Sequence, residues 1–446
     1  MDDVRIAQHS SDELELASPG IRVYTNELSA LLDRHRNELV VRELTQWGDA
    51  TPNNILGRVL SPYYDLIGTL SSLAIFHEQE PGFRTIGLGQ CGVVLERPGR
   101  NYVLKIPKDS HQDALWADFV AHREVERALR AQAQEPVCRV PRVFGYVHKT
   151  NEAWWNENHP LLSEIHQSIS VPAMVLITEH IPPLPEVARQ VLIHRWCPET
   201  SRLEVSANPA NQDCLARVFL GYRRPENAPL ARNFTLRNFN LCLDQMLEIG
   251  LLVESFATAM AEALAIIHWE AKVDAYGIEF VLGSEAQMTD DDTPPSRALE
   301  IPLIDLPPHT DIESPLDTDP EALMCVNFQA RFSRLWILDF NRCTTFSEHD
   351  MIERPDSVLT HLVDAFFDND PYYPLPLMEL DIDQEMWKAF CTAYLRKAKE
   401  ILTGQDPQLV SLPERFIDLC VARERANLSK GLGHGHRGCS DIPGKT

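Results

Sequence analysis

The sequence predicts an α+β fold with two lobes, a strand-rich lobe followed by a helical lobe. Short strand patterns dominate residues 83–183, whereas most of the long helical patterns lie within residues 184–430. Between these parts, residues 181–185 read IPPLP, and consecutive prolines favour a rigid, extended connector. We therefore expect the two lobes to meet at this connector, as at a hinge.

Several other segments are expected to lie outside the two lobes. They are polar, rich in proline, glycine or aspartate, or separated from the main strand and helix patterns. These segments are a disordered acidic start (1–20), a helical extension (21–82, with helices near 23–44 and 63–76), an inserted hairpin (about 186–235), a flexible acidic insertion (284–319) and a disordered tail (431–446).

The composition excludes several classes of protein. The formal net charge of −24 argues against general nucleic-acid binding and against binding to an anionic membrane surface, because both need clustered Lys and Arg. The longest apolar segment, residues 249–269, contains Glu254 and Glu262, so a core helix is expected there and not a membrane span. The acidic first residues do not resemble a signal peptide, and an intracellular location, cytoplasmic or nuclear, is expected.

The ten cysteines are scattered along the chain. No two of them form a CxxC pair, which is the usual spacing of zinc-finger ligands. We therefore expect no zinc.

A glycine-rich hairpin is the first motif that carries chemistry. Residues 86–95 read IGLGQCGVVL and place Gly87, Gly89 and Gly92 in the pattern GxGxxG. A second strand follows these glycines, and a third alternating strand contains Lys105. Such a hairpin can fold over phosphates and offer them backbone amides, with the lysine beneath. The alternative is a glycine-bearing hairpin that binds no ligand.

Two glutamates are candidates for the same nucleotide site. Glu124 lies in the helical pattern of residues 114–132, nineteen residues after Lys105, and is expected to pair with that lysine or to be an ordinary solvated helix residue. Glu179 comes directly before the IPPLP connector and is also assigned to nucleotide binding. We expect Lys105 to pair with Glu124 or with Asp339, the aspartate at the end of a later strand pattern.

Three carboxylates follow in the helical half of the chain. Asp274 lies on a short polar loop between a buried helix and the strand pattern of residues 278–282, where it can meet a substrate hydroxyl or simply cap a turn. Glu279 offers another oxygen ligand, unless it points to solvent. Asp339 ends the buried strand pattern RLWILDF. Asp339 and Glu279 are the candidate metal ligands, because carboxylates suit Mg²⁺ and Mn²⁺.

The order of these motifs resembles that of the protein kinase-like superfamily. The resemblance covers about residues 83–345 and implies a kinase-like two-lobed fold that binds ATP and Mg²⁺ or Mn²⁺. The roles it implies are phosphate cradle for Gly87, Gly89 and Gly92, phosphate ligand for Lys105, lysine partner for Glu124, proton acceptor for Asp274, and metal ligand for Asp339 with Glu279.

A second resemblance rests on three sequence stretches further along the chain. The stretches HWEAKVDAYGIEFVLG, LWILDFNRC and DPYYPLP resemble an uncharacterised fungal family of unknown function, whose members are often labelled as a zinc finger protein domain. The cysteine spacing gives that label no support, and the resemblance implies no substrate.

The chain departs from the kinase pattern at accessory positions. Lys272 and Val273 precede Asp274 where kinases have His-Arg, and no Ala-Pro-Glu segment follows Asp339. Tyr276 stands where the catalytic-loop lysine is usual, Glu279 where an asparagine is usual, and Asn341 where the glycine after Asp-Phe is usual.

Three interpretations follow from these features. The first is a phosphotransferase that acts on an alcohol group of an unidentified protein or small molecule, and the retained Asp274 and Asp339 favour it. The second is a catalytically weak or inactive pseudokinase that serves as a nucleotide-binding or protein-interaction module, which Tyr276 and Glu279 favour. The third is an interaction protein unrelated to kinases.

Overall fold

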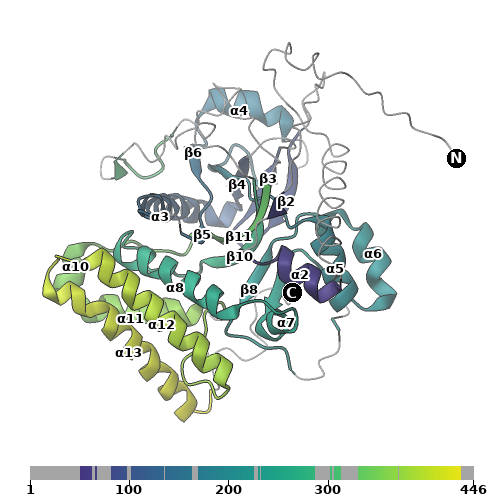
Figure 1. The fold of residues 1–446 in the computed structure, drawn as a ribbon. Coiled ribbons are helices and arrows are strands. Elements are labelled where there is room, and N and C mark those ends of the chain that lie inside the picture. The colour runs from purple at the N-terminus through teal and green to yellow at the C-terminus, as the bar shows by residue number, and fades with distance from the viewer. Residues whose placement is uncertain are drawn as a thin grey trace.

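The protein has an α+β fold in which two sheets are flanked by helices (Figure 1). The computed structural model describes residues 51–62, 66–67, 82–97, 102–134, 136–162, 169–225, 230–231, 233–286, 302–303, 306–312, 330–369 and 371–432. The expected disordered segment at 1–20, the expected disordered tail at 431–446 apart from its first two residues, and the expected helix near 23–44 lie outside these residues.

The first sheet contains the glycine hairpin and Lys105. Its five strands are antiparallel to their neighbours, and their order is β2 (Arg84–Leu88), β3 (Gly92–Glu96), β4 (Tyr102–Pro107), β7 (Val175–Glu179) and β6 (Val143–Val147). The predicted strand–loop–strand arrangement of the glycines is therefore confirmed.

Helices cover both faces of this first sheet. Tyr102, Leu104 and Ile106 of β4 pack in a cluster with Trp154 and Trp155 of α4 (Glu152–Asn158). Because strand side chains alternate, Lys105 points to the opposite face. On that face, Leu115 and Phe119 of α3 (Gln112–Arg130) form a separate cluster with buried residues of β6 and β7. Lys105 is therefore directed toward α3.

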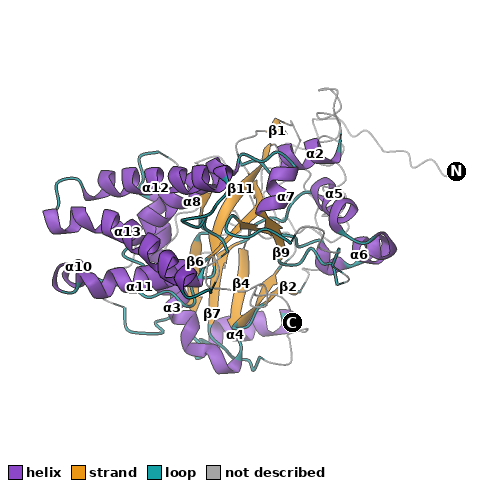
Figure 2. Cartoon of the chain, turned by 90° about the horizontal axis from the view of Figure 1, so that it is seen from below, coloured by secondary structure: helices purple, strands orange, loops and turns teal. Residues whose placement is uncertain are grey.

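The second sheet is mixed and lies at the centre of the molecule (Figure 2). Its strand order is β1 (Leu66–Ile67), β11 (Ala330–Leu338), β10 (Glu279–Ala286), β8 (Ala216–Phe219) and β9 (Phe239–Cys242), and β5 (Cys138–Arg139) pairs with β11. The β8–β9 and β11–β5 pairs are parallel, and the other pairs are antiparallel.

Two groups of helices flank the second sheet (Figure 2). One group holds α8 (Val253–Trp269), α10 (Glu348–Glu353), α11 (Pro355–Asp368), α12 (Asp381–Leu402) and α13 (Pro407–Ser429). The other group holds α2 (Pro52–Val59), α5 (Glu186–Trp196), α6 (Arg202–Ala207) and α7 (Leu243–Glu248). One-turn 3₁₀ helices occupy Asp109–His111, His159–Leu161, Glu199–Ser201 and Pro209–Asn211.

Helix α8 forms the centre of the largest core cluster. It is apolar around most of its circumference, as a fully buried helix must be, and most of its residues are buried. It packs along α12 (Figure 1), and its end leads directly into the Asp274 loop. No helix in the described part of the chain is both long and apolar enough to cross a membrane.

The region expected as an inserted hairpin, about 186–235, belongs to the main fold. In that hairpin the apolar pattern of residues 191–196 predicts a strand. These residues instead form the second half of α5, because Ala188, Leu192 and Ile193 recur on one helical face and are buried. Strand β8 pairs with β10, so this region completes the second sheet.

Two further expectations about secondary structure are corrected. The sequence pattern of residues 240–248 predicts a helix, but the structure has a short strand, β9, followed by α7. Within the expected helix near 63–76, the described pair Leu66–Ile67 forms strand β1, which pairs with β11. In both places strand pairing with distant residues overrides the local helical pattern.

The acidic insertion at 284–319 is structured where it is described. Strand β10 continues to Ala286, so the first residues of this segment belong to the second sheet. Ile312 exchanges backbone hydrogen bonds with Tyr146 of β6 and is 2% exposed. The preceding Asp311 accepts hydrogen bonds from the His148 backbone N–H and the Asn151 side chain. The expectation of a wholly flexible segment is therefore wrong for residues 306–312.

Candidate functional site

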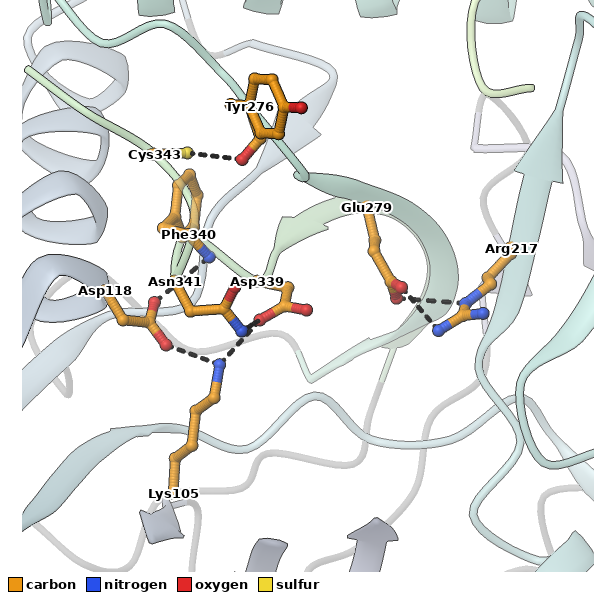
Figure 3. Close-up of polar contacts among 9 residues, drawn as sticks. All are labelled: Lys105, Asp118, Arg217, Tyr276, Glu279, Asp339, Phe340, Asn341 and Cys343. Atoms are coloured by element: carbon orange, nitrogen blue, oxygen red, sulfur yellow. Dashed lines mark hydrogen bonds and ion pairs between the residues drawn. The ribbon is translucent and has the colours of Figure 1, made fainter. Parts of the chain in front are cut away.

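Lys105 bridges two carboxylates that come from distant parts of the chain (Figure 3). Its ammonium Nζ donates to Asp118 Oδ2 at 2.5 Å and to Asp339 Oδ1 at 2.8 Å. Asp118 lies on α3, and Asp339 directly follows β11. The structure therefore brings Lys105 and Asp339 together as expected, with a lysine partner that we did not predict.

The partner of Lys105 on α3 is Asp118 and not Glu124. The two residues are six positions apart, which is about 600° of rotation, so they face directions about 120° apart around the helix. Asp118 shares the buried face with Phe119 and His122, whereas Glu124 pairs with Arg127 and Arg123. The expected Lys105–Glu124 pair is therefore absent in the structure, because the phase of the helix turns Glu124 away.

The charges around Lys105 keep it protonated. Burial by itself lowers the pKa of Lys105, but the Asp118 and Asp339 carboxylates raise it more, and the net shift is upward. An ammonium held between two carboxylates is a fixed positive charge. Such a charge is suited to contact an anionic ligand.

Asp339 is held in a strained backbone conformation. Its φ is +68°, in the left-handed region that costs a non-glycine residue about 1 kcal/mol or more. Its Oδ1 accepts hydrogen bonds from Lys105 and from the Asn341 side chain, and the following Phe340 N–H donates to Asp118 Oδ1. The ring of His122 stacks on Phe340, with centroids 4.7 Å apart. Helix α3 therefore holds both the lysine and the Asp-Phe turn.

The Asp274 loop shows the same kind of strain. Lys272 has a φ of +56° and Ala275 a φ of +60°, so residues on both sides of Asp274 are left-handed. The side chain of Asn369 stabilises this loop, because its Oδ1 accepts the Gly277 N–H and its Nδ2 donates to the Ala275 carbonyl. Strained backbone that is held this firmly occurs most often at functional sites.

Two backbone pairings bring Asp274 and Asp339 into one neighbourhood. Glu279 and Leu338 are partners in the β10–β11 ladder, and Asp274 exchanges hydrogen bonds with the Thr344 backbone. Cys343 lies near both: burial is the main reason that the pKa of its thiol is raised, and the charges of Asp274, Asp118 and Asp339 raise it further. The loop that carries Asp274 and the turn that carries Asp339 therefore lie side by side, and we call them the Asp274–Asp339 loop pair.

Glu279 has a partner that neutralises it. The Arg217 guanidinium of β8 donates two hydrogen bonds to its carboxylate, at 2.5 and 3.1 Å (Figure 3). Burial raises the pKa of Glu279, the Arg217 charge lowers it, and the Asp339 charge raises it again. The two candidate metal ligands, Glu279 and Asp339, would be an uncompensated carboxylate pair if Glu279 had no cation beside it; the structure rules this out, because Arg217 compensates one of the two charges.

The three glycines of the hairpin differ in how strongly the fold requires them. A Cβ on Gly92 would lie 2.6 Å from the Ile106 carbonyl oxygen, and a Cβ on Gly87 would lie 3.1 Å from the Val94 Cβ. A Cβ on Gly89 would make only an ordinary contact. Gly92 and Gly87 are therefore explained by strand packing alone, and only Gly89 lacks a structural reason.

The turn of the glycine hairpin lies close to the charged cluster. Cys91 is in this turn, and burial raises its pKa first. The charge of Asp339 raises this pKa further, while the charges of Lys105 and Arg342 lower it. Because these charges act on the thiol, the hairpin turn lies near Lys105 and Asp339.

Glu179 does not take part in this cluster. Its carboxylate accepts the Arg142 backbone N–H at 3.1 Å, and burial is the main reason that its pKa is raised. In the β4–β7 ladder Glu179 is opposite Tyr102, whereas Lys105 is opposite Leu176. The structure thus gives Glu179 a structural partner at the start of β6 and keeps it three ladder positions from the lysine.

Sequence reasoning missed four residues that the structure places in or beside the site: Asp118, Arg217, Thr344 and His361. Two of them had a recognisable signal, a charged residue inside an apolar pattern. Asp118 interrupts the apolar face of α3, and Arg217 interrupts the apolar strand β8. Such residues need a buried partner. Thr344 and His361 carry no signal of this kind, since both lie at exposed positions.

Comparisons with known proteins match only part of the chain. A family model described as "Zinc finger protein" matches residues 335–406, less than a fifth of the chain, and agrees with the family label expected from the sequence. The matched segment includes Asp339, Thr344 and His361. No curated protein and no solved structure matches the chain.

In the described part of the chain, no set of side chains fits the zinc site that the family description implies. Cys343 and Cys391 are the two cysteines in the matched segment, and both are free. Among the residues that the structure describes, no group of three or more His, Cys, Asp or Glu side chains could hold a metal ion.

Proposed function

We propose that the protein is a kinase-like phosphotransferase. It binds ATP with Mg²⁺ or Mn²⁺ between the first sheet and the Asp274–Asp339 loop pair, and it transfers the terminal phosphoryl group to an alcohol of a protein or small molecule. In this proposal the first sheet with α3 corresponds to the small lobe, and the second sheet with the α8–α13 helices corresponds to the large lobe.

The observation that carries the proposal is the Lys105–Asp339 contact at 2.8 Å. It joins a lysine on the third strand of a glycine hairpin to an aspartate 234 residues later, on a turn with a strained backbone. Phosphoryl transfer needs mainly positioned charges around the phosphates. A protonated lysine on the strand beside the hairpin, next to a partly exposed carboxylate, supplies such charges.

Asp339 is the residue best suited to hold the divalent cation. Its Oδ1 is occupied by Lys105 and Asn341, but no residue in the described part of the chain hydrogen bonds to its Oδ2, and its side chain is 33% exposed. Mg²⁺ is usually held by one or two carboxylates together with phosphates and water. Glu279 fits less well as a ligand, because Arg217 already occupies both of its oxygens.

Two observations favour a second candidate function, a pseudokinase that binds nucleotide without transfer. The Asp274 side chain is fully buried and hydrogen bonded, and Arg217 neutralises Glu279. Both features reduce the number of charged groups that face a substrate. The two candidates share the nucleotide site and differ only in turnover.

Thermal unfolding with ATP, with and without Mg²⁺ or Mn²⁺, tests the shared site. We expect ATP and metal together to raise the melting temperature by about 3 °C at an ATP concentration roughly 100 times Kd. Asp339→Asn should remove most of this rise, and the matched control Asp418→Asn, at an exposed position on α13, should keep it. A wild-type protein without any metal-dependent rise would contradict both candidates.

Release of ADP separates the two candidates. Turnover that depends on Lys105 and on divalent metal supports the phosphotransferase. Metal-dependent binding without any turnover supports the pseudokinase.

A further inference from the structure

His361 is a half-exposed imidazole attached to a fully buried carboxylate. Its Nε2 lies 2.7 Å from Asp274 Oδ2, and the side chains of the two residues are 50% and 0% exposed. His361 lies in α11, 87 residues after Asp274, so only the tertiary structure brings them together. The pair combines an inaccessible carboxylate with an accessible base.

Asp274 has no free oxygen with which to meet a substrate. Its Oδ1 accepts the backbone N–H groups of Tyr276 and Thr344, and its Oδ2 accepts the Thr344 hydroxyl and the His361 ring N–H. These four hydrogen bonds use the acceptor positions that a carboxylate offers. In this arrangement an acceptor alcohol cannot reach Asp274 directly.

The hydrogen bond to Asp274 sets the tautomer of His361. Nε2 carries the proton that it donates to the carboxylate, which leaves an unprotonated lone pair on Nδ1. No group in the described part of the chain hydrogen bonds to Nδ1. The ring is held by stacking on Tyr276, with centroids 6.1 Å apart and planes 12° apart, so its orientation is fixed.

We propose that His361, and not Asp274, accepts the proton of the acceptor alcohol, an inference that rests on the proposed phosphotransferase function. As the alcohol oxygen bonds to the terminal phosphorus, the O–H bond breaks and its proton moves to His361 Nδ1. The bond between that phosphorus and the bridging oxygen breaks, and its electron pair leaves with ADP. Asp274 stabilises the imidazolium and holds its tautomer, and the proton then passes to water.

The test measures ADP release from Mg²⁺–ATP with water as the acceptor, alongside the metal-dependent thermal shift. His361→Ala should reduce turnover by about 100-fold or more, the usual contribution of a general base. The thermal shift should stay at the wild-type value, because His361 does not contact the nucleotide in this proposal. The matched control is His349→Ala, which removes an exposed histidine of α10 and should leave turnover unchanged.

Chemical rescue distinguishes a base from a structural residue. Free imidazole should restore part of the turnover of His361→Ala, because it can occupy the vacated position and accept the proton. It should not restore Asp274→Asn, in which the imidazole of His361 is still present but held in the wrong tautomer.

Each outcome decides for or against the inference. Loss of turnover with unchanged binding and imidazole rescue supports it. Unchanged turnover in His361→Ala, or a loss that imidazole does not rescue, overturns it while leaving the proposed function in place. Metal-dependent binding without wild-type turnover overturns both the inference and the phosphotransferase, and absence of binding overturns the nucleotide site itself.

Discussion

The Lys105 ammonium lies 2.5 Å from the Asp118 carboxylate, whose side chain is only 2% exposed. The same carboxylate accepts the Phe340 N–H through its other oxygen. One buried aspartate of α3 therefore holds both the lysine and the turn that presents Asp339. Movement of α3 would displace both groups together, so the position of this helix determines whether the site is assembled.

Asp118→Asn tests this relationship. The amide keeps the shape of the side chain but loses the charge, so we expect the free energy of unfolding to fall by about 2 kcal/mol, the usual worth of a hydrogen bond to a charged group. The ATP- and metal-dependent thermal shift should fall as well. Urea unfolding and thermal shift measure the two effects.

The matched control for Asp118→Asn is Glu124→Gln, which removes a carboxylate charge from a different face of the same helix. Its carboxylate pairs with the half-exposed Arg127 and, at 3.5 Å, with the buried Arg123, so some stability should be lost but the ATP- and metal-dependent thermal shift should stay at the wild-type value. A Glu124→Gln variant that lost as much stability and binding as Asp118→Asn would show that the lysine partner has been assigned wrongly.

Arg217→Met should destabilise the protein by about 3 kcal/mol. It leaves the Glu279 carboxylate buried without its cation, and breaking a buried ion pair on one side costs about that much. Replacing both residues, Arg217→Met with Glu279→Met, should recover most of the loss, since no buried charge then remains. A double-mutant cycle by urea unfolding measures the coupling; additive losses would mean that the two side chains do not depend on each other.

Ile312→Ala should lower the free energy of unfolding by about 3 kcal/mol. The side chain is buried against Phe119, Tyr146 and Leu176, and truncation leaves a cavity in that cluster. Pro308→Ala, at an exposed position four residues earlier, should change stability by less than about 1 kcal/mol. Urea unfolding measures the stability of both variants. If both substitutions had equally small effects, residues 306–312 would be a loop that the fold does not need.

His122 should make the stability fall in mild acid. Burial lowers its pKa from 6.5 to about 4, so between these pH values the unfolded chain binds a proton that the folded protein does not. This contribution is complete above pH 6.5 and is lost as the pH falls toward 4, by roughly 3 kcal/mol in all. Glu126 acts in the opposite direction, because burial raises its pKa to about 7.

The difference between wild type and His122→Gln isolates this contribution, because Glu126 and the other groups are common to both proteins. Glutamine can still donate to the Pro141 carbonyl, which His122 Nε2 contacts at 2.6 Å. The advantage of His122→Gln over wild type should grow as the pH falls from 6.5 to 4. A difference that does not change with pH would show that the imidazole is not buried in the neutral form.

The sequence by itself predicted the α+β class, the glycine hairpin, the strand position of Lys105, the helices around α8, and the turn at Asp339. These features are local, because a strand alternates, a helix repeats every 3.6 residues and glycine-rich turns break both patterns. The predicted neighbourhood of Lys105 and Asp339 also agrees with the structure. That proximity was predicted from the order of the motifs along the chain. A resemblance to a known family can supply such an order, but it gives no distance between residues.

Only the tertiary structure decided which side chains meet. Asp118 replaces Glu124 because the phase of α3 against β4 depends on how the helix packs, and spacing along the chain does not fix it. Arg217 reaches Glu279 through the β8–β10 pairing, and His361 reaches Asp274 through the packing of α11. Hydrogen bonds and ion pairs act over about 3 Å, whereas these partners are separated by 62 and 87 residues. Their contacts therefore depend on the whole fold and not on any local pattern.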